Sequence, residues 1–471
     1  MTGSITFFGA AGNVTGSKHV LKIAGKTILL DCGTFQGLPD VRERNRSLPF
    51  TPESIDAVII SHAHLDHIGM LPLLVKRGFK GPIFATPTTI DVARYMLNDA
   101  AHIEIQDAAY NKKHHLGPPD ARHPLFTPHD IPLTMERFKP TPYARHNDIW
   151  HDISDNIRFK LYDAGHILGS AVIVIEVEEQ GTMTHVAYTG DLGPQDVPLL
   201  HNPEIPTEPI ETLILESTYG SRSHEPLEQA MDRLAKSINN VYNRGGKMIL
   251  PSFSLGRTQF LVYLLHKLTD ENKIPRFPIY VDSPLATAVT EVFKTHAADF
   301  DEETLKDFTG QNHEPLLFSN LKYVQSVEES KKINTEPGPL MIISASGMMT
   351  GGRVLHHLRY ILPDPKNAIF ITGYQAAGTL GRHLLEGAQD IDILGDSIPV
   401  RAEMLLFNEF SAHADQQELQ AYAEKLKNLK QIMLVHGEPH QADDLKDILK
   451  IAHPEWKIDR PEEGDTIPLV I

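Results

Sequence analysis

The sequence predicts a two-domain α/β protein in which one domain interrupts the other. The chain has 471 residues, more than a single hydrophobic core usually needs. Between about residues 217 and 404, four units repeat an apolar strand, a loop of small residues and a helix. The segments on either side are different, because short strands there end in His or Asp residues that adjoin glycine. An inserted α/β domain within a strand-rich domain accounts for all three observations.

The first segment reads as strands separated by tight turns and then by helices. The run Ala57–Ser61 is continuously apolar up to its last residue, as expected for a strand buried on both faces. The other strands expected here are Ile5–Gly9, His19–Ile23, Thr27–Asp31, Arg158–Tyr162, Ala171–Val177, Thr184–Thr189 and Thr212–Glu216. Helices fit Ile68–Lys76, Thr88–Asn98 and much of Ala100–His115, whereas the Pro-rich and His-rich segment Pro118–Pro142 is expected to be irregular.

The central segment predicts a doubly wound parallel sheet, because strands alternate with helices. The four strand and helix pairs are Lys247–Leu250 with Thr258–Leu268, Ile279–Val281 with Leu285–Phe293, Leu340–Ile343 with Arg353–Ile361, and Ala368–Ile371 with Thr379–Leu385. Ligands bind such sheets beyond the carboxyl ends of the strands, where helix N-termini attract anions. Three units place an arginine there, namely Arg257, Arg353 and Arg382. Each could be an ordinary solvated helix residue, but three in one structural position favour phosphate binding.

After about Met404 the first pattern resumes. The motif Ser411-Ala412-His413-Ala414-Asp415 precedes a helix, and the strand Gln431–Val435 ends at His436. We therefore expect a first domain formed by residues 1–217 and 409–471, and an inserted domain formed by residues 218–408.

Composition limits the classes of function. No run approaches the roughly 18 apolar residues of a membrane span, and the N-terminus has no secretory signal. Cys32 is the single cysteine, which favours a reducing, cytoplasmic setting and a metal site built from His and carboxylates. The formal net charge of −17 argues mildly against a nucleic-acid partner, since phosphate contacts come from Lys and Arg. A metalloenzyme can still bind phosphate with its metal and a few arginines.

The strongest motif is Ser61-His62-Ala63-His64-Leu65-Asp66-His67, which follows the buried strand directly. His and Asp are zinc ligands, and three His with one Asp in six residues are too dense for chance. Residues two apart on an extended turn point the same way, so His62 and His64 can bind one ion. Asp66 and His67 can then face a neighbouring ion.

Four residues cannot complete two metal sites, so further ligands are expected at other strand ends. His166, Asp191 and His436 each follow a strand and adjoin glycine. Each of these alone could be a turn former, but together with the first cluster they supply two sets of ligands.

These motifs resemble the metallo-β-lactamase fold, an αββα sandwich, with Asp31, the cluster from His62 to His67, His166 and Asp191 at its successive motifs. Glu216, His413 and His436 look like the three further motifs of the β-CASP nucleases, which carry an inserted α/β domain. The likeness covers nearly the whole chain. It is greatest to RNA-processing members such as the endonuclease subunit of the cleavage and polyadenylation machinery, because His436 stands where the DNA-directed branch typically has an aliphatic residue.

The resemblance implies two Zn²⁺ ions and a role for each motif. One zinc would take His62, His64 and His166, the other would take Asp66, His67 and His436, and Asp191 would bridge them. Asp31 would orient a ligand histidine. Asp66, His413 and Glu216 would take part in catalysis, with His413 binding the phosphate or protonating the departing oxygen while Glu216 holds its imidazole. The substrate-binding residues expected in the inserted domain are Ser254, Arg257, Ser346, Arg353, Thr379 and Arg382.

The resemblance predicts a zinc-dependent ribonuclease that cleaves single-stranded RNA endonucleolytically, with 5′-to-3′ exonuclease action also compatible. A homodimer is compatible with the sequence as well. Three alternatives stay open: a small-molecule hydrolase of the same fold, a DNA nuclease, and a non-catalytic scaffold. The motifs at Glu216 and His413 disfavour the first, His436 disfavours the second, and the complete set of metal ligands disfavours the third.

Overall fold

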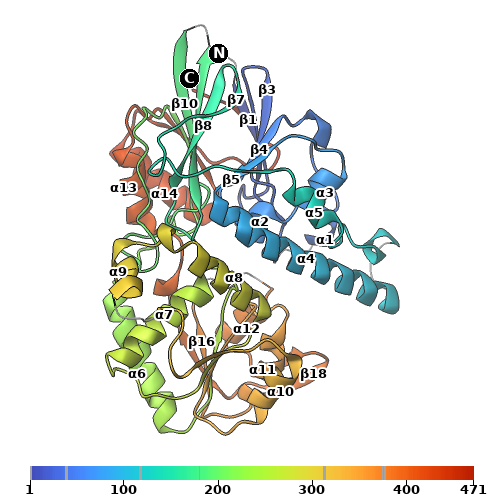
Figure 1. The fold of residues 1–471 in the computed structure, drawn as a ribbon, viewed down its shortest axis with the longest axis vertical. Coiled ribbons are helices and arrows are strands. Elements are labelled where there is room, and N and C mark those ends of the chain that lie inside the picture. The colour runs from blue at the N-terminus through green and yellow to red at the C-terminus, as the bar shows by residue number, and fades with distance from the viewer. Residues whose placement is uncertain are drawn as a thin grey trace.

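The fold is an αββα sandwich into which a second α/β domain is inserted. A computed structural model describes residues 3–37, 41–115, 119–179, 181–310, 314–373, 375 and 378–470. The sandwich lies above the inserted domain in Figure 1, and β7, β8 and β10 stand at its top. Among the described helices, none is long and apolar enough to cross a membrane.

Two seven-stranded sheets form the sandwich. In order across the first sheet, the strands are β22 (Thr466–Pro468), β1 (Ser4–Phe8), β2 (Lys18–Ile23), β3 (Lys26–Leu30), β4 (Ala57–Ile59), β5 (Ile83–Ala85) and β6 (Phe138–Pro140). Across the second sheet they are β21 (Lys457–Asp459), β20 (Gln431–Val435), β11 (Thr212–Glu216), β10 (Thr182–Tyr188), β9 (Ala171–Glu179), β8 (Ile157–Asp163) and β7 (His151–Ser154). The two inner faces share one apolar core, in which Phe7 and Leu30 meet Ile173 and Val435.

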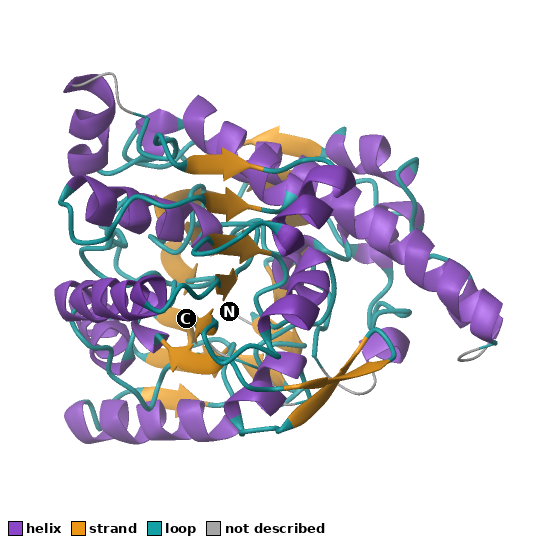
Figure 2. Ribbon diagram, turned by 90° about the horizontal axis from the view of Figure 1, so that it is seen from below, coloured by secondary structure: helices purple, strands orange, loops and turns teal. Residues whose placement is uncertain are grey.

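Helices cover both outer faces of the sandwich. Those of the N-terminal part are α1 (Val41–Arg44), α2 (Leu65–Ile68), α3 (Leu71–Lys76), α4 (Pro87–His114) and α5 (Asp130–Met135). The second sheet is covered by α13 (Gln416–Lys425) and α14 (Pro439–Ala452). The helix α4 is long, and its C-terminal half projects from the body in Figures 1 and 2.

The inserted domain is built on a six-stranded sheet whose recorded pairings are all parallel. In order, its strands are β14 (Leu321–Tyr323), β13 (Ile279–Val281), β15 (Met341–Ser344), β12 (Met248–Pro251), β16 (Ala368–Ile371) and β19 (Glu403–Leu406). Its helices are α6 (Leu227–Asn243), α7 (Arg257–Asp270), α8 (Pro284–Thr295), α9 (Glu302–Gly310), α10 (Val327–Thr335), α11 (Arg353–Ile361) and α12 (Leu380–Leu385). A hairpin of β17 (Asp390–Ile393) and β18 (Asp396–Pro399) is added to them. Figure 2 shows these strands side by side with helices around them.

The structure confirms the predicted fold class, and two local expectations were wrong. The two helices expected at 88–98 and 100–115 are one helix, because a single buried face continues through the expected break, with Met96 and Leu97 before it and Ala101 and Ala108 after it. The segment 118–142 contains α5 and β6 where we expected irregular structure. Its prolines are interspersed with Phe126, Ile131 and Phe138, which are buried in the core and fix the chain there. The predicted domain boundaries stay a prediction.

Candidate metal centre

The expected metal ligands meet at one edge of the sandwich, because each follows the carboxyl end of a strand. His62 follows β4, His166 follows β8, Asp191 follows β10 and His436 follows β20. The strands β10, β11 and β20 run parallel in adjacent positions, so the residues after them share an edge. Asp191 and His436 meet there although 245 positions separate them in the sequence. Sheet order therefore assembles the site from distant parts of the chain.

The first set of donors consists of His62, His64, His166 and Asp191. The Nδ1 atom of His64 lies 3.0 Å from His62 Nε2 and 3.2 Å from His166 Nε2. Asp191 Oδ2 lies 3.5 Å from His62 Nε2 and 3.6 Å from His166 Nε2. A tetrahedral zinc with ligands at about 2.0–2.1 Å separates those ligands by about 3.3–3.4 Å. The four atoms thus have the spacing that a zinc site needs.

The second set consists of Asp66, His67 and His436, with the other oxygen of Asp191. His67 Nε2 lies 3.3 Å from His436 Nε2, 4.0 Å from Asp66 Oδ2 and 3.5 Å from Asp191 Oδ1. His64 is extended, whereas Asp66 and His67 lie in the first turn of α2. This change from extended to helical backbone directs His62 and His64 to one set and Asp66 and His67 to the other, where the sequence had suggested a single extended turn.

Hydrogen bonds on the outer side of four imidazoles determine which nitrogen faces the centre. The Nδ1 atom of His67 donates to Asp31 Oδ2 at 2.7 Å, and that of His166 donates to the Ala412 carbonyl at 2.7 Å. His62 Nδ1 lies 3.0 Å from Ser61 Oγ, a hydroxyl that itself donates to Asp31. Such outer partners hold the ring orientation and the tautomer of a metal ligand.

His436 is held in the same way by Thr218. The Thr218 hydroxyl donates to the His436 carbonyl at 2.8 Å, so its oxygen is left to accept from His436 Nδ1 at 3.1 Å. With the Nδ1 protons of His62, His67 and His166 used outside, their Nε2 atoms present lone pairs to the centre. His436 Nε2 lies 3.3 Å from His67 Nε2, and its Nδ1 lies 3.5 Å from Asp191 Oδ1 as well.

The ring nitrogens and carboxylate oxygens that face the centre are therefore suited to bind a cation. Three pairs of ring nitrogens lie 3.0–3.3 Å apart. Two of the pairs share His64 Nδ1, so its single proton can bridge at most one pair. Asp191 Oδ1 is buried and has no hydrogen-bond partner among the described residues. A buried carboxylate oxygen without a partner is costly, and a metal ion placed between the donor atoms removes that cost. The donor set of imidazole and carboxylate fits zinc.

Burial and charge set the protonation of the ligands. Burial lowers the pKa of His64 to about 4 and that of His62 and His166 well below the ordinary value, so these rings are neutral and able to bind metal. Burial also acts to lower the pKa of His67, but the Asp191 and Asp31 carboxylates outweigh it and raise that pKa well above the ordinary value. The surroundings of His67 thus favour a positive charge, which a proton or a metal ion can supply.

Beside the two sets lie His413 and Glu216. His413 Nδ1 donates to Glu216 Oε1 at 3.1 Å, and its ring centroid is 4.6 Å from that of His166. The fully buried Glu216 carboxylate is itself held by the backbone N–H groups of Leu192 at 2.7 Å and Thr218 at 3.2 Å. Burial acts to lower the pKa of His413, but Glu216 outweighs it and raises that pKa. Glu216 thus favours the charged form of His413, which lies beside the candidate metal ligands and in that form can bind an anion or donate a proton.

The predicted substrate-binding residues differ in their surroundings. Arg353 donates to Asp282 at 2.6 Å, Arg382 donates to Glu386 at 2.7 Å, and Ser254 lies 3.2 Å from Ser283. The Ser346 hydroxyl accepts from Thr350 N, and the Thr379 hydroxyl accepts from Arg382 N as the N-cap of α12. These contacts lie within the inserted domain, and the substrate roles stay a prediction.

Arg257 is different, because its side chain has no ion pair or hydrogen bond within the described residues. Burial lowers the pKa of its guanidinium to about 10, and its charge acts on His413. The guanidinium packs against Gly373, where a Cβ atom would lie 2.6 Å from Arg257 Nη1. Arg257 is thus a desolvated cation near His413, and no anion among the described residues pairs with it.

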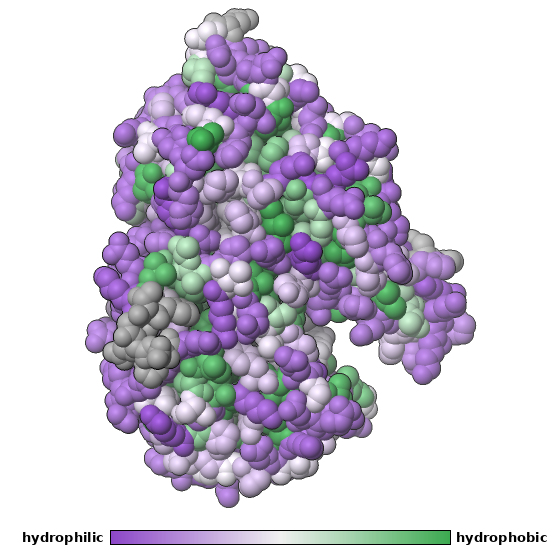
Figure 3. Space-filling view, in the orientation of Figure 1, coloured by the Kyte–Doolittle hydropathy of each residue, from purple (hydrophilic) through white to green (hydrophobic). Residues whose placement is uncertain are grey.

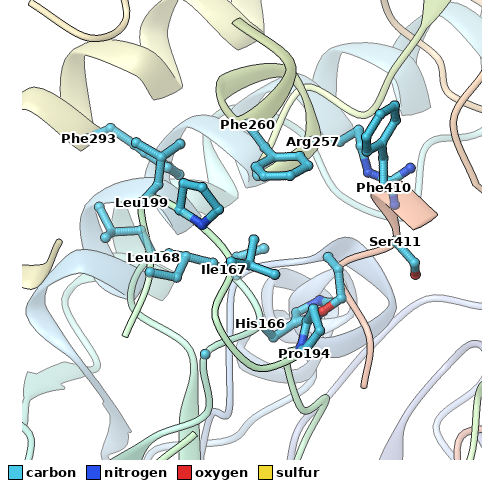
Figure 4. Close-up of a pocket in the computed structure, with 16 residues that line it drawn as sticks. His166, Ile167, Leu168, Pro194, Leu199, Arg257, Phe260, Phe293, Phe410 and Ser411 are labelled. Carbon is cyan, nitrogen blue, oxygen red and sulfur yellow. The ribbon is translucent and has the colours of Figure 1, made fainter. Parts of the chain in front are cut away.

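An apolar pocket lies between the two domains, behind His166. Its walls include Ile167 and Leu199 of the sandwich and Phe260 and Phe293 of the inserted domain, all of which are labelled in Figure 4. Arg257, Ser411 and Ala412 also line it, so the pocket reaches the segment that precedes His413.

Comparison with known families agrees with this geometry. The Metallo-beta-lactamase superfamily model matches residues 16–237, the Beta-Casp domain model matches residues 258–384, and the Zn-dependent metallo-hydrolase RNA specificity domain model matches residues 397–461. The chain belongs to the β-CASP family of metallo-β-lactamase-fold hydrolases.

Relatives of this β-CASP protein include bacterial, archaeal and fungal proteins. It is 35% identical to "Ribonuclease TTHA0252" of Thermus thermophilus, over 97% of this chain and 98% of that protein. It is 32% identical to "Transcription termination factor FttA" of Methanocaldococcus jannaschii, over 95% of this chain and 68% of that protein. It is 30% identical to "Endoribonuclease YSH1" of Eremothecium gossypii, over 95% of this chain and 57% of that protein.

A solved structure shares the fold. The crystal structure of a protein of unknown function from Enterococcus faecalis V583 matches with a TM-score of 0.55 and 14% identity, over the whole of both chains. At that identity the match concerns the β-CASP fold alone.

Sequence reasoning missed several residues of this β-CASP site. Ser61 and Thr218 hold ligand rings, and Tyr188 donates from its hydroxyl to Asp31 Oδ2 at 2.8 Å. Each stands within three residues of a predicted ligand or of Glu216, so adjacency to a motif was an available signal. The Ala412 carbonyl gave none, because any residue supplies a carbonyl.

Proposed function

We propose that this protein is a ribonuclease that hydrolyses RNA phosphodiester bonds at a centre of two zinc ions. The observation that carries the proposal is Asp191, a buried carboxylate whose two oxygens face two separate groups of imidazole nitrogens. The names of the relatives, "Ribonuclease TTHA0252" and "Endoribonuclease YSH1", support RNA as the substrate and endonucleolytic cleavage as the mode.

One zinc would be held by His62, His64 and His166, the other by Asp66, His67 and His436, with Asp191 between them. When bound, the zinc ions would supply an activated water as the nucleophile and stabilise charge on the phosphate. Asp66 serves catalysis as a ligand, and Asp31 holds the His67 ring. The expected products carry a 5′-phosphate and a 3′-hydroxyl.

His413, supported by Glu216, would act as the proton donor in the reaction. The Glu216 carboxylate accepts from His413 Nδ1 and favours the charged imidazole, which leaves Nε2 to donate to a phosphate oxygen or to the departing oxygen. Arg257 adds a second cation that can bind a phosphate oxygen through its paired N–H groups. Of the six predicted substrate-binding residues, Arg257 has the strongest support. The homodimer and the cytoplasmic setting stay predictions.

The decisive experiment uses 5′-labelled single-stranded RNA and a DNA of the same sequence, each with and without a chelator. We expect RNA to be cut internally and the chelator to abolish cutting. Release of mononucleotides from the 5′ end would indicate exonuclease action. Cleavage of DNA in place of RNA would overturn the substrate assignment, and hydrolysis of a thioester or lactone with neither polymer cut would overturn the nuclease assignment.

A matched variant separates catalysis from metal binding. His413→Ala is expected to reduce cleavage while two zinc ions per chain remain bound, as measured by elemental analysis. Loss of one zinc in this variant would show that His413 is a ligand, because its ring also lies near Asp191 and His436.

A further inference from the structure

The helix α4 joins the candidate metal centre to the periphery of the molecule. At its start, the Thr86 and Thr89 hydroxyls both donate to the Gly169 carbonyl, at 2.7 and 2.8 Å, in the loop that carries His166. The helix then runs for 28 residues, or about 42 Å. Its second half projects from the sandwich (Figures 1 and 2).

One face of α4 is directed at the inserted domain. The Thr88 hydroxyl donates to Asp299 Oδ2 at 2.6 Å, and Asp91 Oδ2 accepts from His296 Nε2 at 2.8 Å. Residues at intervals of three or four share a face of a helix. The positions that continue this face beyond the contact with the inserted domain are Tyr95, Asp99, His102, Gln106, Tyr110 and Lys113, which we call the α4 stripe.

The α4 stripe is mostly exposed and carries groups that suit a nucleic acid. Tyr95 and Tyr110 are 42% and 56% exposed, and the Tyr110 ring lies 4.3 Å from the His114 ring. Exposed aromatic faces that bases can stack on, combined with cations that meet phosphates, are typical of single-strand binding surfaces. Lys113 ends the stripe, and the helix carries no acidic residue after Asp107. Asp99 is the one acidic member of the stripe.

The position of the stripe agrees with a path for a strand. In the space-filling view, the projecting helix overhangs a notch between itself and the inserted domain (Figure 3). The stripe continues the face of α4 that contacts the end of α8 and the following turn, Ala297–Asp299. The stripe therefore faces this notch. A strand that leaves the metal centre along α4 would pass the stripe from Tyr95 to Lys113, a length of about 27 Å.

We propose that the α4 stripe binds single-stranded RNA outside the cleavage site, by stacking bases on Tyr95 and Tyr110 and contacting a phosphate with Lys113. This inference rests on the proposed ribonuclease function and extends it. The stripe would extend the contact with RNA beyond the metal centre in a protein with a net charge of −17, because Asp99 is its one acidic member.

The test compares two double variants on the same two turns of α4. Tyr110→Ala with Lys113→Ala removes an aromatic ring and a charge from the stripe. The matched control, Ile105→Ala with Lys112→Ala, removes an apolar side chain and the same charge from exposed positions on another face. All four side chains are exposed, so both proteins are expected to fold equally, which their melting temperatures would verify.

Each protein is assayed with an RNA of about 16 nucleotides, long enough to reach the stripe, and with one of about 4 nucleotides. We expect the stripe variant to raise KM for the long RNA about tenfold and to leave kcat and the short RNA unchanged, since base stacking on an aromatic ring contributes about 1–3 kcal/mol. A plot of log affinity for the long RNA against log salt concentration should also be less steep in the stripe variant. The slope should change by about 0.7, because one phosphate contact is removed.

The outcomes separate this inference from the proposed function. Equal KM values for the long RNA in the stripe variant, the control and the unaltered protein would overturn the stripe as an RNA surface. An equal loss in both double variants would overturn it too, because general charge would then explain the binding. If the unaltered protein cuts neither RNA, the proposed function itself fails.

Discussion

At the scale of single residues, the outer hydrogen bonds of the imidazoles determine whether the centre can bind metal. Ser61, Asp31, Ala412 and Thr218 each accept a hydrogen bond from the Nδ1 atom of one ring. Thr218 has a further contact, because its backbone N–H donates to Glu216. One residue thus connects a metal ligand with the carboxylate that supports His413.

We expect Thr218→Val to weaken metal binding without unfolding the protein. Valine has the shape of threonine but cannot accept from His436 Nδ1, so the ring loses its tautomer and orientation. Loss of such an outer partner typically lowers metal affinity about 10–100-fold. Competition with a zinc-sensitive dye measures it, and Thr218→Ser is expected to restore most of the affinity. Unchanged zinc affinity in Thr218→Val would contradict the role assigned to the hydroxyl.

The pH dependence of cleavage should report His413. Its pKa is raised by Glu216, so the protonated form is present below that pKa and is lost as pH rises through it. We expect the activity to fall on the alkaline side with loss of this proton. Glu216→Gln removes the charge that raises the pKa, so the alkaline limb of kcat/KM should move to lower pH. An unmoved limb would assign it to another group.

At the scale of elements, the start of α4 determines the position of the loop that carries His166. Thr86 is the N-cap residue, accepting from Thr89 N at 3.1 Å while its hydroxyl donates to the Gly169 carbonyl. The Thr86 side chain therefore both caps the helix and binds the loop that carries His166.

Thr86→Ala should lower the free energy of unfolding by about 1 kcal/mol, the usual contribution of an N-cap side chain. Thr86→Ser keeps the oxygen and should lose much less. Urea denaturation of the two variants at a fixed zinc concentration measures the difference. Equal midpoints for Ala and Ser would mean that the cap contributes nothing and that the contact with Gly169 is dispensable.

At the scale of the whole molecule, the two domains share an apolar core. Ile167, Leu168 and Leu199 of the sandwich belong to the same buried cluster as Leu255 and Phe293 of the inserted domain. The candidate metal ligands span positions 62 to 436, so a bound metal would hold together strands from both ends of the chain.

Metal removal is therefore expected to lower the melting temperature. A ligand that binds the native state alone stabilises it by about 2.7 kcal/mol when present at a hundred times its dissociation constant. Calorimetry with chelator and with added zinc measures the shift. Asp191→Asn should reduce the response to zinc, whereas His413→Ala should keep it. An unaltered protein with the same melting temperature in chelator and in zinc would contradict metal binding to the folded state.

The sequence by itself determined the fold class, the ligand types and their places at strand ends. Apolar runs, glycine turns and the cluster from His62 to His67 are local features, and local features can be recognised from the sequence alone. The same holds for the four repeated units of the inserted domain, each of which the structure contains.

Tertiary structure alone decided which ligands face one another and which protons they keep. His436 and Asp191 meet because β20, β11 and β10 are neighbours, and only strand order places them so. The sequence could not show that Arg353 pairs with Asp282 whereas Arg257 has no ion pair among the described residues, since both arginines begin a helix after a strand. Partners from distant segments set burial, and burial sets charge, so the chemistry of the site depends on contacts that sequence spacing does not encode.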